Sequence, residues 1–125
     1  MNPGKFTLVI GASEKPERYS NKAIRMLRRY NHPVAAIGLK AGKVEDISFE
    51  TGKPSYENID TVTLYVGPAH QSSYIDYVIG LHPKRIIFNP GTENEVFEQK
   101  ATAAGIYCLE ACTLVLLSTG QYWVS

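Results

Sequence analysis

The residues best suited to chemistry lie between positions 11 and 21, where the sequence reads GASEKPERYSN. A glycine lets a ligand approach the backbone closely, short polar side chains donate hydrogen bonds, and an arginine can contact two oxygens of a pyrophosphate at once. If a helix begins within this segment, its free N–H groups and its dipole also favour a phosphate. The candidate phosphate-binding residues here are Gly11, Ala12, Ser13, Arg18, Ser20 and Asn21.

Two common phosphate-binding motifs do not fit this segment. The dinucleotide motif G-x-G-x-x-G would place glycine where Ser13 and Pro16 stand, and no G-K-[ST] triplet closes the segment as in a P-loop. After the next apolar run, where NAD-binding domains usually carry an acidic residue, the chain has Leu39 and Lys40, with Lys43 nearby. A cation there favours a phosphorylated ribose, so coenzyme A (CoA) and NADP both match better than NAD. Ordinary solvation explains two loop lysines equally well.

Glycine and proline also follow two later apolar runs of the chain. A lone glycine loop is readily explained by a tight turn, but here the same feature recurs after each run. These additional candidates for the walls of a ligand site are Gly67, Pro68, Asn89, Pro90 and Gly91.

Five short apolar, β-branched runs predict the strands that must position these loops. They cover residues 6–10, 33–38, 61–66, 85–88 and 106–109. Between residues 39 and 60 the pattern is less regular, and Val44, Ile47 and Phe49 indicate at most a small extended excursion.

Helical spacing separates the predicted strands. A first helix is expected from Ser20, as its N-cap, to the stop at residues 31–33. Gly67 and Pro68 are expected to cap and begin the second helix, and a capping box over residues 92–95 to begin the third, which Gly105 ends. Residues 113–119 form a last helix or a packed tail.

This alternation predicts a single α/β domain over residues 1–125, a doubly wound Rossmann-like fold with a mainly parallel sheet of about five strands and helices on both faces. In such sheets the ligand lies outside the carboxyl ends of the strands, near the point where the winding reverses. The fold therefore brings the glycine- and proline-bearing loops to one edge.

Composition excludes several other classes of function. A formal charge of +1 gives no overall field for nucleic acid, and no apolar run approaches the length of a membrane span. Without a signal-peptide core at the start of the chain, a cytoplasmic location is expected. Two cysteines, Cys108 and Cys112, predict reduced thiols and no metal.

The loop pattern also resembles a known family. The segment 11–20, read as GASxxPxRxS, the Gly67-Pro68 and 89–91 loops and the AAGI sequence at 103–106 together resemble the CoA-binding domain family, which includes small stand-alone proteins and the N-terminal domain of the succinyl-CoA synthetase α subunit. The resemblance implies that the first loop contacts the phosphates of CoA, Lys40 lies toward the 3′-phosphate, and the later loops shape the pantetheine channel. Two departures are Leu39-Lys40, where the family commonly has Asn-Pro, and a partial match at 110–113.

The resemblance implies a protein that binds CoA or acyl-CoA, and no complete catalytic constellation is visible. His32 and His82 precede prolines at helix ends, where histidines are usually caps or solvated, and His70 alone lies near the predicted site. A small NADP-binding oxidoreductase or redox sensor is the alternative. A third hypothesis is a subunit whose catalysis depends on an acyl-CoA synthetase-type partner, and Trp123 near the end of the chain hints at packing in a homo-oligomer.

Overall fold

A computed structural model describes residues 4–124 of the chain. Its main sheet has five strands, all parallel, in the order β2-β1-β5-β6-β7. The strands are β1 (Thr7–Ala12), β2 (Val34–Gly38), β5 (Thr61–Leu64), β6 (Arg85–Phe88) and β7 (Tyr107–Glu110). The winding therefore reverses between β1 and β5, because the chain moves outward to β2 and then returns past β1.

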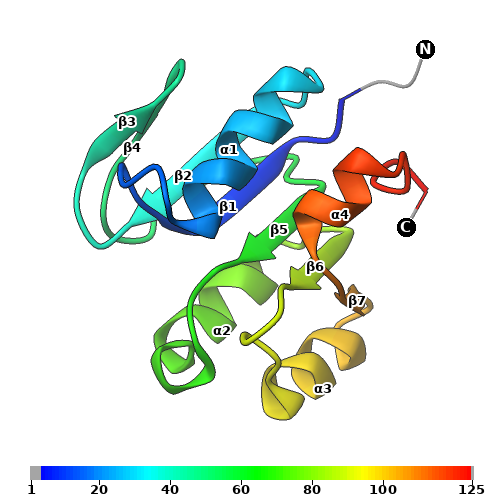
Figure 1. The fold of residues 1–125 in the computed structure, drawn as a ribbon. Helices are drawn as coiled ribbons and strands as arrows, with labels where there is room; N and C mark the ends of the chain where they lie inside the picture. Colours follow the sequence, from blue (N-terminus) through cyan, green and yellow to red (C-terminus); the bar gives the residue numbers. More distant parts are fainter. Residues whose placement is uncertain (1–3, 125) are drawn as a thin grey trace.

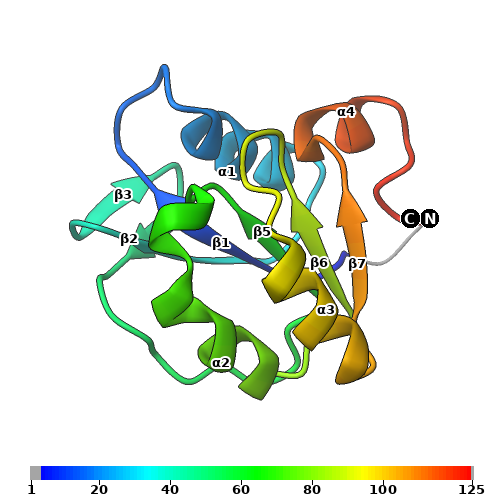
Figure 2. The same cartoon turned by 90° about the horizontal axis from the view of Figure 1, so that it is seen from below.

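Helices cover both faces of this sheet (Figure 1, Figure 2). On one face lie α1 (Tyr19–Arg29) and α4 (Thr113–Ser118), and on the other α2 (Ser72–Gly80) and α3 (Glu95–Ala103). Successive residues of β1 alternate between the two cores, with Leu8 and Ile10 on the α2–α3 side and Val9 on the α1–α4 side. The strands lie in continuous apolar runs of the sequence because both of their faces are covered by helices. The doubly wound fold is confirmed.

The irregular segment between β2 and β5 contains a small hairpin. Strands β3 (Gly42–Val44) and β4 (Ile47–Phe49) pair antiparallel, and β4 runs beside the outer edge of β2. Val44 and Phe49 are buried in the α1–α4 core. The extended segment expected between residues 39 and 60 is therefore this hairpin, which lies beyond the outer edge of β2.

Two expected helix starts were wrong. Arg18, not Ser20, is the N-cap of α1, and Ser20 is buried in the first turn. Asn94, not a box starting at Thr92, caps α3: its Oδ1 accepts a hydrogen bond from the Phe97 N–H at 3.2 Å. Gly67 and Pro68 do cap and begin a helix, but this is the short 3₁₀ helix η1 (Pro68–His70), and α2 follows from Ser72.

The amino end of the sheet is closed by buried polar groups. Arg85 Nη1 donates to the carbonyl of Tyr122 at 2.9 Å, and its guanidinium lies 4.4 Å from the centre of the Tyr122 ring. His32 is fully buried, with its ring centre 4.8 Å from that of Tyr122 and 4.9 Å from that of Trp123. The expectation that His32 caps a helix or is solvated was therefore wrong. No helix among residues 4–124 is long and apolar enough to cross a membrane.

His32 predicts an acid-sensitive stability. Burial, followed by the positive charges of Arg85 and Lys5, lowers the pKa of His32 from 6.5 to about 4. The unfolded chain then binds this proton more tightly, so the stabilisation is complete above pH 6.5 and is lost as the pH falls toward 4. The His32 contribution to the free energy of unfolding should decrease by about 2–3 kcal/mol over this range.

Urea unfolding of the wild type and His32→Gln across this pH range tests the prediction. The glutamine can still accept the Lys5 N–H, which donates to His32 Nδ1 at 2.9 Å, but cannot titrate. The variant should show a flatter pH dependence. Equal slopes in the two proteins would refute the assignment.

Candidate functional site

The loops that follow β1, β2, β5 and β6 meet at the carboxyl edge of the sheet, around the β1–β5 switch point (Figure 2). In open parallel sheets, this is the crevice in which ligands bind. Topology therefore brings the residues singled out in the sequence to one edge. Some of their side chains face outward, however, whereas others are buried and form hydrogen bonds within the protein.

Gly11 determines the backbone path at the carboxyl end of β1. Its φ is +102°, and the pairing of β1 with β2 shifts register between Ile10 and Ala12, as in a β-bulge. A Cβ on Gly11 would lie 2.9 Å from the carbonyl oxygen of Tyr65, the residue that follows β5. Glycine is therefore required both by the backbone conformation and by the close approach of the neighbouring strand.

The segment after β1 is held by Asn21 on the first turn of α1. Asn21 Nδ2 donates to the carbonyl of Ser13 at 3.0 Å, and its Oδ1 accepts from Arg25 Nε at 2.7 Å. Ser13 Oγ accepts the N–H of Lys15 at 3.2 Å, whereas the side chain of Arg18 is exposed. Asn21 thus shapes the loop, and Arg18 and Lys15 are the cations that this loop presents to solvent.

Lys40 lies directly beyond β2, next to this loop. Gly38 allows the ends of β1 and β2 to approach closely, because a Cβ at that position would lie 2.5 Å from the carbonyl oxygen of Ala12. Lys40 and Lys43 are both exposed. Lys40 therefore follows the point at which β2 closely approaches the end of β1.

Asn89, after β6, is buried, with 2% of its surface exposed. Its Nδ2 donates to Thr63 Oγ1 at 2.7 Å and to the carbonyl of Leu64 at 2.8 Å, and its Oδ1 accepts the N–H of Thr113 at 2.9 Å. The side chain therefore links β5, β6 and α4. The neighbouring Pro90 and Gly91 are exposed on the rim, as is Pro68, with Gly67 half-buried beside it.

Gln71 is a further organising residue that the sequence analysis did not identify. It is fully buried, and its Nε2 donates to the carbonyls of Val66 and Thr92 at 2.8 and 2.7 Å, while its Oε1 accepts from Asn94 Nδ2 at 3.0 Å. The loops after β5 and β6 are thus tied together. The available signal was its spacing from Ile75 and Val78, which places it on the buried face of the helix.

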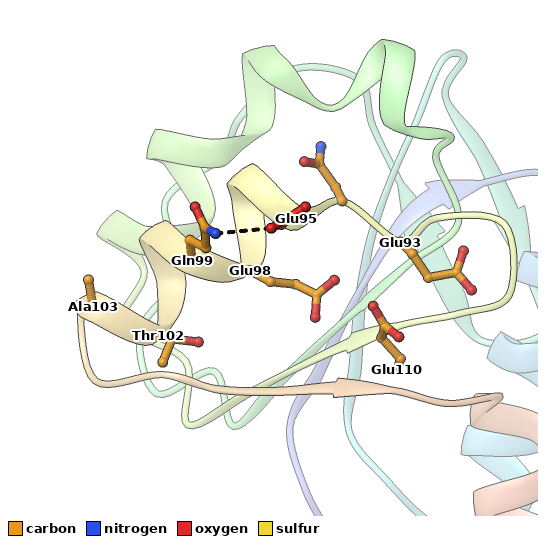
Figure 3. Close-up of a pocket in the computed structure, with 8 residues that line it drawn as sticks. Glu93, Glu95, Glu98, Gln99, Thr102, Ala103 and Glu110 are labelled. Carbon is orange, nitrogen blue, oxygen red and sulfur yellow. Dashed lines mark hydrogen bonds between the residues drawn. The ribbon is translucent and has the colours of Figure 1, made fainter.

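A groove away from the carboxyl edge has the wrong charge for a polyanion. It encloses about 720 Å³ between α3 and β7, and its lining includes Glu93, Glu95, Glu98 and Glu110. Figure 3 shows the carboxylates of Glu98 and Glu110 directed into the same space. Burial and the proximity of Glu110 raise the pKa of Glu98. Phosphates would be repelled here, so the groove is not the candidate site.

The cysteines and His70 are the remaining candidates for chemistry. Cys108 and Cys112 are free and half-buried, and burial raises the pKa of the Cys108 thiol. His70 is exposed in η1. Within residues 4–124, no three His, Cys, Asp or Glu side chains are placed to hold a metal ion.

A doubly wound parallel sheet with glycine- and proline-bearing loops around its switch point defines a Rossmann-like ligand-binding fold. The chain belongs to the CoA-binding domain family, because the family model described as a CoA binding domain matches residues 5–118. The resemblance in the loop pattern is thereby confirmed.

Solved structures agree with this fold. A crystal structure of an uncharacterized protein is 41% identical, with a TM-score of 0.93 over 97% of this chain and 100% of the other. A hypothetical protein from Pyrococcus horikoshii OT3 is 25% identical, with a TM-score of 0.80 over 90% and 81% of the two chains. A cell-free protein, ID.343 from Thermus thermophilus, is 20% identical, with a TM-score of 0.84 over 95% and 91%. No curated protein matches the chain.

The close approach at Gly11 predicts a large cost for an added methyl group. Gly11→Ala should destabilise the protein by about 2–4 kcal/mol, combining positive-φ strain with a clash against the Tyr65 backbone. Gly105→Ala is the matched control, because Gly105 has a φ of +84° but nothing within 4 Å of an added Cβ. The control should cost about 1 kcal/mol in thermal unfolding. Equal losses would show that the close approach contributes nothing.

Asn89 gives a second stability prediction. Asn89→Asp keeps the shape but removes the donor to Thr63 and Leu64 and buries a charge, which should cost about 3–5 kcal/mol. The exposed Asn58→Asp should change the free energy of unfolding by less than about 0.5 kcal/mol. Urea unfolding at pH 7 measures both, and similar values for the two variants would contradict the linking role of Asn89.

Proposed function

We propose that this protein binds CoA or acyl-CoA at the carboxyl edge of its sheet and has no catalytic activity by itself. Membership of the CoA-binding domain family is the observation that carries the proposal. The position of the segment after β1 at the switch point supports it, since this is where the fold accommodates phosphorylated ligands.

The character of the crevice fits the chemistry of CoA. Its pyrophosphate and 3′-phosphate need cations, and exposed Arg18 and Lys40 lie on the adjacent loops after β1 and β2. In this proposal Gly11, Ala12, Ser13, Ser20 and Asn21 form and support the backbone around the pyrophosphate. When bound, CoA would supply a thiol that carries an acyl group.

The pantetheine arm is assigned to the inner side of the crevice. Gly67 and Pro68 line it from the loop after β5, and Pro90 and Gly91 from the loop after β6, with Asn89 and Gln71 fixing the positions of both loops. Short and rigid residues at these points leave room for an uncharged, extended chain.

The non-catalytic role is supported by the placement of the histidines. His32 is buried at the amino end of the sheet, remote from the crevice, and His70 is exposed on η1. We therefore assign any chemistry on a bound acyl group to an acyl-CoA synthetase-type partner subunit.

Titration calorimetry at matched ionic strength tests the proposal with CoA, acetyl-CoA, dephospho-CoA, NADP and NAD. Arg18→Ala should weaken CoA binding about tenfold, because it removes a phosphate contact worth about 1.4 kcal/mol. Lys40→Ala should weaken CoA binding to a similar degree but leave dephospho-CoA unchanged. Lys100→Ala, on the distant α3, is the control and should bind like the wild type.

Each alternative has a distinct outcome. Binding of NADP without CoA would favour the NADP-binding oxidoreductase or redox sensor instead. Full CoA affinity in both alanine variants would overturn the site while keeping the function. Failure of the wild type to bind any of these ligands would overturn the function itself.

A further inference from the structure

Glu14 places a carboxylate in the loop to which the proposed function assigns phosphates. Simple electrostatics predicts that such a charge weakens the binding of a polyanion. The side chain is nevertheless engaged: Glu14 Oε2 accepts the backbone N–H of Lys43 at 2.9 Å. This hydrogen bond connects the loop after β1 to strand β3 of the hairpin, across 29 residues of sequence.

The stem of Glu14 is also packed against the hairpin. A Cβ on Gly42 would lie 2.6 Å from Glu14 Cγ, 2.7 Å from Glu14 Cδ and 2.8 Å from the Phe49 ring. Glu14 therefore lies across Gly42, in a gap that exists because residue 42 has no side chain. The contact involves both the stem and the carboxylate, which distinguishes it from a surface ion pair.

The hairpin needs such anchors, because a two-stranded ribbon is marginally stable alone. Its turn is anchored on the side away from the crevice, where Arg28 forms a bidentate pair with Asp46 at 2.9 and 2.8 Å. Val44, next to the turn, and Phe49, at the open end of the hairpin, are buried in the α1–α4 core. Glu14 supplies the anchor at the crevice end, next to the connection that carries Lys40.

We propose that Glu14 is a positioning residue that clamps the β3–β4 hairpin to the loop after β1 and thereby holds Lys40 and Lys43 beside the phosphates of the ligand. This inference rests on the proposed function. Its consequence is opposite in sign to the electrostatic one, because the hydrogen bond and the packed stem of Glu14 then strengthen the binding of CoA by more than its charge weakens it.

Three variants separate the clamp from the charge. Glu14→Ala removes both and should weaken CoA binding about five- to tenfold, as expected for an oriented hydrogen bond and its packed stem. Glu14→Gln keeps an acceptor for the Lys43 N–H and removes the charge, so it should bind CoA as tightly as the wild type or about twofold more tightly. Glu17→Gln is the control, because Glu17 is exposed in the same loop and makes no side-chain hydrogen bond within residues 4–124. Removing its charge should tighten binding by about twofold.

Calorimetry with CoA and with 4′-phosphopantetheine measures these effects. The loss in Glu14→Ala should appear with CoA and not with phosphopantetheine, which lacks the adenosine 3′-phosphate and the second phosphate of the pyrophosphate. Thermal unfolding should differ little among the variants, showing that the loss is local. If Glu14→Ala binds CoA as tightly as Glu17→Gln, the clamp has no role in binding.

Hydrogen exchange of the Lys43 amide provides a readout independent of any ligand. Exchange should accelerate in Glu14→Ala and remain slow in Glu14→Gln and Glu17→Gln. Unchanged exchange in Glu14→Ala would overturn the clamp even where CoA binds. Failure of the wild type to bind CoA would overturn the proposed function, while the exchange result would still decide whether Glu14 holds the hairpin.

Discussion

The carboxyl edge of the sheet depends on the buried amide of Asn89. Strands β5 and β6 end there, and α4 begins, so backbone groups that belong to no regular ladder need partners inside the protein. One side chain satisfies the carbonyl of Leu64 and the N–H of Thr113 and also contacts the Thr63 hydroxyl. An apolar residue of the same size would remove the hydrogen bonds to the Leu64 carbonyl and the Thr113 N–H. The asparagine is thus explained by the fold, whatever the ligand.

Gln71 extends the same arrangement outward. It joins the loop after β5 to the loop after β6, and Thr92 Oγ1 donates to the carbonyl of Asn89 at 2.8 Å. Buried amides therefore fix the inner half of the crevice, formed by the loops after β5 and β6, without any ligand. Under the proposed function this rigidity would lower the entropic cost of binding. The outer half, around Arg18 and Lys40, is exposed and is held by the contacts of Asn21, Gly38 and Glu14. If CoA binds as proposed, the inner half would face its uncharged arm and the outer half its phosphates.

The sequence was sufficient for the strands, because runs that are apolar on both faces are typical of a covered parallel sheet. It was insufficient for the helix caps. Ser20 has the preferred side chain for an N-cap, yet it is buried in the first turn of α1, whose N-cap is Arg18. Thr92 fits a capping box, but its hydroxyl donates to the carbonyl of Asn89, which leaves the cap to Asn94. A preferred residue type therefore does not settle where a helix begins when its side chain is buried or bonded elsewhere.

The same limitation applies to the site. The loops could be placed from the strand pattern alone, since parallel strands bring their carboxyl ends to one edge. The role of each side chain could not, because an amide that binds a ligand and an amide that binds the backbone look alike in sequence. Asn21 and Asn89 face inward, whereas Arg18 and Lys40 face solvent.

Charge separation completes the argument for the crevice. The net charge of +1 conceals an uneven distribution. The charged residues that line the groove between α3 and β7 are all carboxylates, whereas the loops near the ends of β1 and β2 carry the cations Lys15, Arg18, Lys40 and Lys43 together with Glu14 and Glu17. A polyanion approaching the groove is repelled, while cations are available at the carboxyl edge. The sign of the local charge is therefore the reason for assigning the proposed ligand to this edge rather than to the groove.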